Sequence, residues 1–367
     1  MKTKLHSIAT LVLCSLFVFA LPLWGLITPD GDVSLSERRP LAAFPDLNAE
    51  SIQSGAFMKD FEKYTADHFP LRDTFRRLKA YSTFYLMNRR DNNGIFLYGS
   101  HAVKTEYPLN ESSIDYAADR FTYVYDRYLK DSGGKVYLSV IPDKGYFVPD
   151  GAGYLKLDYN GLTDRLREKL PFVRYVDVFP LLSLDDYYTT DTHWRQERIV
   201  PVARRLAEAM GVTLPDVQYT EAVSPHPFFG EYHGQSALPL GADSLRYLES
   251  DVISRLETFD YETGKSIPVY DISRLTGNDP YEVFLSGPKS LLTVENKNTD
   301  SERELIIFRD SFGSSIAPLL AEGYRKITLV DFRYLSPAML GDLISFEGAD
   351  VLFLYSTSVL NNSNTIK

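Results

Sequence analysis

The feature that most constrains the fold is an alternation of short apolar runs with amphipathic helical segments. In the first half of the chain, strand-like runs at 135–141 and 172–178 flank a helical segment at 162–170. The alternation returns near the C-terminus, with strands and helices at 305–308, 314–321, 326–331, 336–344 and 350–355. Parallel strands need crossover helices between them, so the pattern predicts an α/β fold with a mainly parallel sheet flanked by helices.

Two regions depart from this alternation. Residues 212–298 lose helical periodicity and are rich in Pro, Gly and Tyr, with strand-like runs at 252–259 and 266–270, which predicts a β-rich insertion. Residues 56–88 have helical spacing of aromatic residues, which Pro70 is expected to interrupt. We expect one main domain over 51–360, with this insertion, and a frayed polar tail at 361–367.

The N-terminus carries an uncharged apolar run at 8–28, preceded by Lys2 and Lys4 and followed by Asp30 and Asp32. The run matches the roughly 20 apolar residues that a membrane span needs. No small-residue cleavage site follows it, and the charge bias places the main domain outside the cytoplasm. We therefore predict a signal-anchor at 1–28 and a tether at 29–50. Secretion after cleavage is the alternative.

The composition excludes several classes of function. The formal net charge of −10 argues against nucleic-acid binding. The single cysteine, Cys14, lies inside the apolar run, so the main domain has neither a disulfide nor a thiol nucleophile. The six His show no spacing typical of a metal site, and we predict neither a metal nor a cofactor.

Ser311 follows the apolar run 305–308 and directly precedes a helical segment. A serine on a strand-to-helix turn is exposed at the end of a sheet, beside backbone N–H groups that can hold an oxyanion. This position is suited to a nucleophile. The alternative is that Ser311 only caps the helix, which is a common role for serine.

A second stretch, Asp191-Thr192-His193-Trp194, supplies groups that can activate a serine. On a loop, Asp191 can accept a hydrogen bond from the His193 imidazole, whose other nitrogen can then take a proton from Ser311. Asp67-His68 is a competing acid–imidazole pair.

These motifs resemble the DHHW protein family, which is grouped with the SGNH-hydrolase-like proteins of alginate O-acetylation. Further stretches that carry the resemblance lie at 36–41, 67–73, 141–144 and 229–232. Thr192 stands where the family name has a second His, and Arg309 replaces the Gly of the Gly-Asp-Ser sequence of SGNH enzymes. The resemblance places Asp67-His68 in a packing segment.

The resemblance implies an extracytoplasmic O-acetyltransferase that modifies an exported or cell-surface polysaccharide, supplied with acetyl groups by a membrane-bound O-acyltransferase. Ser311 would be the nucleophile, His193 the base and Asp191 the residue that orients His193. The backbones of Ser311, Phe312 and Gly230 are oxyanion candidates. Two rival functions remain, a carbohydrate acetylesterase and a non-catalytic scaffold of a polysaccharide modification complex.

Four side chains are candidates for substrate binding: Trp194, Tyr232, Lys144 and Arg309. Trp194 can stack on a sugar face or only pack its loop. Lys144 follows the strand-like run 135–141, where it can meet a substrate anion or remain a solvated lysine.

Overall fold

The computed structural model describes residues 2–367, which form two compact units. The first unit comprises the chain up to Asn93 together with His233–Leu240. The second comprises Gly94–Tyr232 and Gly241–Lys367. The units divide at residue 93 rather than at the expected boundary near residue 50, because the helices of 51–93 pack within the first unit.

The first unit begins with a continuous helix made of α1 (Lys2–Ser15), a π-helical turn η1 (Leu16–Ala20) and α2 (Leu21–Ile27). Within it, His6–Ile27 is long and apolar enough to span a membrane, with a mean hydropathy of 2.3. None of the side chains in this span is buried inside the protein. The helix coincides with the apolar run expected at 8–28.

The remaining elements of the first unit are short. They are β1 (Val33–Ser34), β2 (Arg39–Pro40), α3 (Ala49–Gln53), α4 (Ala56–Asp67), α5 (Arg72–Tyr81), η2 (Ser82–Leu86) and β3 (Asp91–Asn92). The helical region breaks between α4 and α5, around Pro70, as expected. β1 and β2 pair antiparallel, so the segment predicted as a tether contains a hairpin.

Ion pairs hold this unit together. Glu37 lies within 2.5 Å of the Arg72 guanidinium and 3.0 Å from that of Arg76. Arg39 donates to Asp67 Oδ2 at 2.8 Å, and this hydrogen bond lowers the pKa of Asp67 to about 2, although burial opposes it. His68 Nε2 bonds to the Ala42 carbonyl at 2.9 Å. Asp67 and His68 therefore have structural partners, which supports reading them as packing residues.

The second unit is built on an eight-stranded sheet in the order β11-β10-β12-β14-β13-β15-β6-β7. Its strands are β6 (Val136–Ile141), β7 (Arg174–Tyr175), β10 (Glu257–Asp260), β11 (Lys265–Ile267), β12 (Leu291–Glu295), β13 (Glu304–Arg309), β14 (Lys326–Val330) and β15 (Asp350–Ser356). β14, β13, β15, β6 and β7 run parallel. β12, β10 and β11 extend the sheet antiparallel.

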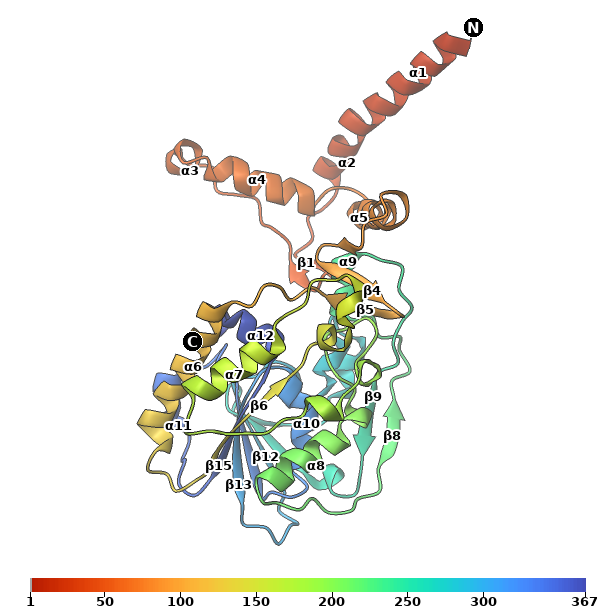
Figure 1. Ribbon diagram of the computed structural model, residues 1–367. Coiled ribbons are helices and arrows are strands. Elements are labelled where there is room, and N and C mark those ends of the chain that lie inside the picture. Colours follow the sequence, from red (N-terminus) through yellow and green to blue (C-terminus); the bar gives the residue numbers. More distant parts are fainter. Residues whose placement is uncertain (1) are drawn as a thin grey trace. The chain divides into compact units, whose positions relative to one another are not determined.

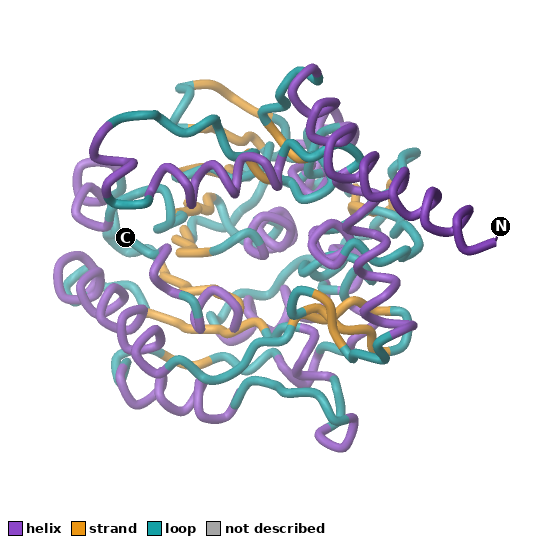
Figure 2. The backbone as a smooth tube through the Cα atoms, turned by 90° about the horizontal axis from the view of Figure 1, so that it is seen from above, coloured by secondary structure: helices purple, strands orange, loops and turns teal. Residues whose placement is uncertain are grey.

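Helices cover both faces of this sheet (Figures 1 and 2). α8 (Val200–Ala209) and α10 (Phe312–Leu320) pack on one face, against Leu305, Ile307 and Leu352. α6 (Glu111–Val124) and α7 (Tyr159–Lys169) pack on the other, against Ile306 and Phe308. Successive side chains of a strand point to opposite faces of the sheet. The uniformly apolar runs of the sequence therefore contribute side chains to the hydrophobic cores on both faces.

The other elements of the second unit are short and lie mainly in its connections. The strands and helices are β4 (Ile95–Tyr98), β5 (His101–Lys104), β8 (Thr220–Val223), β9 (Arg246–Glu249), α11 (Leu340–Leu343) and α12 (Thr357–Asn361). Helix α9 (Glu231–Ser236) begins in this unit, but its residues from His233 on belong to the first unit. Single helical turns are η3 (Tyr125–Leu129), η4 (Lys144–Phe147), η5 (Asp150–Ala152), η6 (Phe179–Leu181), η7 (Leu184–Asp186), η8 (Gln196–Arg198), η9 (Ile253–Arg255), η10 (Ile272–Thr276), η11 (Pro280–Val283), η12 (Pro337–Met339) and η13 (Ser363–Thr365).

Two sequence-based expectations are corrected here. The run 252–259 is only partly a strand, because η9 precedes β10. The C-terminal residues are also packed, since Ile366 is buried, the Tyr116 hydroxyl donates to its carbonyl at 2.9 Å, and the Ser363 N–H donates to Ser113 Oγ at 2.6 Å. The polar side chains that suggested fraying are used in hydrogen bonds to α6.

Candidate active site

Ser311 lies on the turn between β13 and α10, at the carboxyl end of a central parallel strand. The Asp310 carboxylate fixes this turn, because it accepts the Phe312 N–H at 3.0 Å and the Ser356 N–H of β15 at 2.7 Å. The Ser311 side chain is partly exposed and makes no capping hydrogen bond to α10. The alternative that Ser311 serves as a helix cap is therefore wrong.

Asp191 and His193 lie on a loop that is closed by a bridge between Tyr187 and Trp194. The Tyr188 N–H donates to the His193 carbonyl at 3.1 Å, so this hydrogen bond also joins the two sides of the loop. Asp191 turns back on the loop, since its Oδ1 accepts the backbone N–H of His193 at 3.0 Å. This turn lets two side chains only two positions apart meet.

The structure brings together the three side chains that the sequence singled out. His193 Nδ1 is 2.6 Å from Asp191 Oδ1, and His193 Nε2 is 2.7 Å from Ser311 Oγ. A carboxylate only accepts hydrogen bonds, so the proton of a neutral imidazole resides on Nδ1. Nε2 is then free to accept the Ser311 hydroxyl, which is the arrangement that activates a serine nucleophile.

Electrostatics favour a protonatable His193. Burial lowers the pKa of His193, but the charge and hydrogen bond of Asp191 outweigh it, and Asp279 and Glu231 act in the same direction. The pKa therefore lies above its ordinary value of 6.5. The raised pKa stabilises the His193 imidazolium that forms when the imidazole takes the Ser311 proton.

Asp243, which the sequence analysis did not single out, holds the loop that carries Asp191 and His193. Its two carboxylate oxygens accept the backbone N–H groups of Thr189 and Thr190, both at 2.8 Å, and the two threonine hydroxyls at 2.5 Å. One carboxylate thus binds the two residues that immediately precede Asp191. An acid 52 positions after Asp191 carries no local sequence signal for this role.

Tyr281 is a second residue that the sequence did not reveal. Its ring stacks on the His193 imidazole, with 3.8 Å between centroids and 9° between planes. Its hydroxyl donates to Ser315 Oγ at 2.8 Å, and the Trp194 indole N–H donates to the same oxygen at 2.8 Å. Tyr281 lies in the region read as an insertion, so this region contributes directly to the site.

The four substrate-binding candidates are corrected, because none of them is exposed: Trp194 and Arg309 are 0% exposed, Lys144 is 2% and Tyr232 is 4%. Trp194 packs its loop, edge-to-face on Phe312. The Tyr232 hydroxyl bonds to Thr192 Oγ1 at 3.0 Å. Each side chain supports the site from within the protein.

Lys144 and Arg309 are buried cations. Lys144 Nζ donates to the carbonyls of Tyr188 and Thr189, at 3.0 and 3.2 Å, and burial lowers its pKa to about 7 although nearby carboxylates oppose this. Arg309 lies 3.7 Å from Asp331 Oδ2 and donates to the Asp310 carbonyl at 3.3 Å. Lys144 thus supports the Asp191 loop, and Arg309 supports the Ser311 turn.

The three backbone N–H groups predicted to hold an oxyanion differ in whether they already have an acceptor. The Phe312 N–H is bound to Asp310, and the Gly230 N–H donates to Thr190 Oγ1 at 2.8 Å, so neither is directed at an incoming substrate. The Ser311 N–H has no acceptor among residues 2–367. Of the three predicted backbone groups, only Ser311 retains a donor for an oxyanion.

Gly230 is needed for a different reason. A Cβ atom at this position would lie 2.3 Å from the Asp191 Cβ and 2.4 Å from the Thr190 carbonyl oxygen. We expect Gly230→Ala to lower the free energy of unfolding by about 1–3 kcal/mol and to displace Asp191. Thermal unfolding measures the first effect and ester turnover the second. Gly241→Ala is the matched control, because a Cβ there meets nothing within 4 Å; equal behaviour of the two variants would contradict the packing argument.

The fold and this arrangement define an α/β protein with a Ser–His–Asp hydrogen-bonded chain at the carboxyl end of its sheet. No protein-family model matches the sequence, and neither does any curated protein. Solved structures do match, and they confirm the predicted resemblance at the level of the fold.

One is a DHHW family protein from Eubacterium siraeum, with a TM-score of 0.57 and 19% identity over 75% of this chain and 94% of that one. Another is PatB1 from Bacillus cereus, with a TM-score of 0.58 and 16% identity over 72% and 96% of the two chains. PatB1 also matches in a structure with a sulfonyl adduct, at a TM-score of 0.57 and 17% identity over 72% and 97%.

Proposed function

We propose that this protein is a membrane-anchored, extracytoplasmic O-acetyltransferase of the SGNH type, which modifies a polysaccharide through an acetyl-serine intermediate. The observation that carries the proposal is the chain of hydrogen bonds from Asp191 through His193 to the partly exposed Ser311. The choice of acetyl group and polysaccharide follows from the motif resemblance to the alginate O-acetylation proteins. Anchoring follows from the span His6–Ile27.

In the first half of the proposed reaction, Ser311 Oγ attacks the carbonyl carbon of the acetyl donor while His193 Nε2 takes the hydroxyl proton. The Ser311 N–H is available to the carbonyl oxygen as it becomes negative. Collapse of the intermediate breaks the bond to the leaving oxygen of the donor, which receives the proton from His193. Asp191 stabilises the imidazolium in between.

In the second half, a sugar hydroxyl of the acceptor attacks the acetyl-serine and gives its proton to His193. The intermediate then releases Ser311, which recovers this proton. Water in place of the sugar hydroxyl would turn the same steps into hydrolysis, the reaction of the rival carbohydrate esterase. A membrane-bound O-acyltransferase is the proposed source of the acetyl group.

The experiment that tests this proposal is mass spectrometry of the full chain after incubation with p-nitrophenyl acetate or with a sulfonyl fluoride. The expected result is one adduct, on Ser311, together with release of p-nitrophenol. Transfer to added oligosaccharide supports the transferase, and release of acetate despite the acceptor supports the esterase. Absence of both adduct and turnover would reject catalysis and favour the scaffold.

The raised pKa of His193 predicts the pH dependence of this activity. Only the neutral imidazole accepts the Ser311 proton, so kcat/KM for p-nitrophenyl acetate is expected to rise with pH along a limb centred above 6.5. The free energy of unfolding is expected to change in the opposite direction, falling as pH rises. The contribution of His193 is fully present below pH 6.5 and is lost as pH rises through the folded-state pKa.

The control for this prediction is Asp191→Asn, which removes the charge that raises the pKa while the burial of His193 remains. The limb should move to lower pH, and the plateau should fall by about 10⁴-fold, as for the same change in serine proteases. A pH–rate profile of both proteins measures this. A limb that stays in place would show that His193 is not the titrating base.

A further inference from the structure

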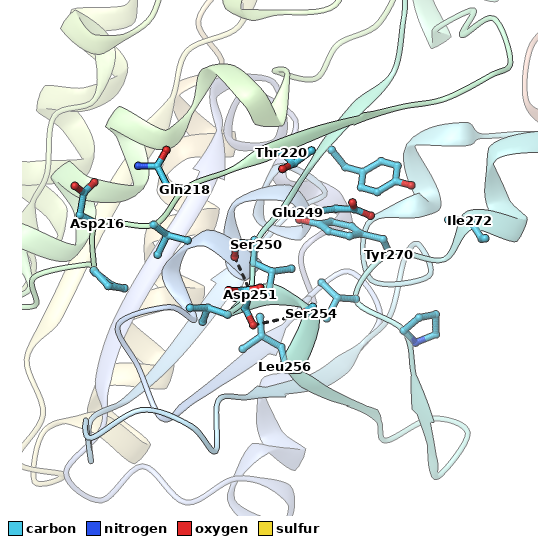
Figure 3. A pocket seen from close by; sticks show the side chains of 17 residues that line it. Asp216, Gln218, Thr220, Glu249, Ser250, Asp251, Ser254, Leu256, Tyr270 and Ile272 are labelled. Carbon is cyan, nitrogen blue, oxygen red and sulfur yellow. Dashed lines mark hydrogen bonds between the residues drawn. The ribbon is translucent and has the colours of Figure 1, made fainter.

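A cavity of about 1040 Å³ lies in the second unit, lined by 17 residues between Pro215 and Ile272 (Figure 3). None of the residues that form the hydrogen-bonded chain to Ser311 lines it. Its walls come from the segment after α8, from the paired strands β8 and β9, from residues 250–256 after β9 and from the segment after β11. The cavity is therefore built entirely by the region that interrupts the α/β alternation.

The lining combines aromatic faces with hydrogen-bonding groups. Tyr247 and Tyr270 lie side by side with 4.7 Å between ring centroids. The Tyr270 ring is held in place, because its hydroxyl donates to the Leu248 carbonyl at 2.8 Å. Figure 3 shows Glu249 and Thr220 near Tyr270, and Gln218 with Asp216 at another part of the cavity wall. Sugars bind to such surfaces with their C–H faces on aromatic rings and their hydroxyls on polar groups.

The charges of the cavity limit which sugars fit. Asp216, Glu249 and Asp251 line it, whereas no Lys, Arg or His does. Asp216 pairs with Arg204, whose guanidinium is 3.4 Å away. A neighbouring cavity of about 620 Å³ shares Asp251 with this one and is lined by Arg255 and Arg303. Carboxylates accept sugar hydroxyls well but repel uronates and phosphates.

The cavity is also connected to the candidate active site. The Tyr270 hydroxyl lies 3.2 Å from Gln196 Oε1, and Gln196 Nε2 donates to the Ser315 carbonyl at 2.7 Å. Ser315 belongs to α10, the helix that Ser311 precedes. The Gln196 side chain thus joins the wall of the cavity to α10, the helix that follows Ser311.

A polymer that reacts at Ser311 also has sugar units beyond the reacting one, and these units can bind elsewhere on the protein.

We infer that this cavity binds uncharged sugar units of a glycan and excludes polyuronates. Its role as a subsite for the acceptor rests on the proposed function, whereas its ability to bind uncharged glycan does not. The acceptor would then differ in charge from alginate, although the motifs of the chain resemble alginate O-acetylation proteins.

The test measures binding to full-length Ser311→Ala protein in nanodiscs, so that no turnover occurs. The probes are hexasaccharides of β-1,4-linked glucose, β-1,4-linked N-acetylglucosamine and β-1,4-linked mannuronate. Isothermal titration calorimetry measures the binding of each. We expect at least one uncharged probe to bind more than tenfold tighter than the uronate. Failure of both uncharged probes, or equal or tighter binding of the uronate, would overturn the inference.

Charge reversal locates the binding. Glu249 is exposed and faces Thr220 across the β8–β9 pair. Glu249→Lys should weaken the uncharged probe about tenfold, as expected for loss of a charged hydrogen-bond acceptor, and tighten the uronate. Glu347→Lys makes the same charge change at an exposed carboxylate outside the cavity and should alter neither. Tyr247→Ala, checked for folding by circular dichroism, should also weaken the uncharged probe.

The outcomes separate the two proposals. Turnover of p-nitrophenyl acetate by the parent, with glycan binding that ignores Glu249→Lys and Tyr247→Ala, would remove this inference alone. Glycan binding that responds to both variants, in a parent without adduct or turnover, would remove the acetyltransferase alone.

Discussion

Replacing Ser311 with alanine is expected to lower ester turnover by about 10⁶-fold, the size of the loss when the nucleophile of a serine hydrolase is removed. The physical reason is that the Ser311 hydroxyl forms the covalent intermediate and no other hydroxyl contacts His193 Nε2 in the described residues 2–367. Stability should change little. The hydroxyl makes no capping bond, so only its hydrogen bond to His193 is lost, at a cost of about 0.5–1.5 kcal/mol. Steady-state kinetics and thermal unfolding measure the two quantities.

Ser314→Ala is the matched control, because Ser314 is a buried serine in the first turn of α10, the helix that follows Ser311. It should retain the parent rate within a few-fold. His193→Ala should be nearly as damaging as Ser311→Ala, and the double variant no worse than either, since the groups act as one unit. A Ser311→Ala protein that keeps the parent rate would show that another group is the nucleophile.

Replacing Tyr281 with leucine is expected to lower kcat by about 10²-fold with KM unchanged. The Tyr281 ring covers one face of the imidazole at 3.8 Å, so its loss lets His193 leave the position in which Nε2 meets Ser311. We regard Tyr281 as a positioning residue, since it acts through His193. Tyr281→Phe keeps the ring and loses only the bond to Ser315 Oγ, so it should stay within about tenfold of the parent.

Two comparisons separate positioning from a general loss of packing. Tyr324→Leu truncates another fully buried tyrosine, whose hydroxyl contacts Met210 Sδ, and should lower the unfolding temperature without the fall in kcat. Tyr281→Leu should also have no further effect in a His193→Ala background. A further loss of rate there, or an equal loss of kcat in Tyr324→Leu, would contradict the positioning role.

Much of the architecture follows from local sequence pattern. Runs such as 351–354 are apolar at every position, and only a strand buried on both faces can use such a run. Pro70 has no backbone N–H to donate within a helix, which made the break between α4 and α5 predictable. The placement of Ser311 follows in the same way, because a polar residue between a strand and a helix lies on the turn that joins them.

The meeting of Asp191, His193 and Ser311 needed more than pattern. His193 and Ser311 are 118 positions apart, and their contact depends on how the strands and their connections are ordered in the sheet. The family resemblance suggested that they meet, whereas composition and periodicity did not. Asp243 and Tyr281 carry no such motif, so both were missed.

Burial of polar and aromatic side chains was decided by the tertiary structure alone. Trp194, Tyr232, Lys144 and Arg309 look in the sequence like substrate-binding residues, yet each is covered by segments distant along the chain. The antiparallel pairing of β12 with β14, which adds β10–β12 to the main sheet, is likewise a long-range contact. Residue type and spacing determine the local conformation of a segment, but long-range packing determines which of its side chains solvent and substrate can reach.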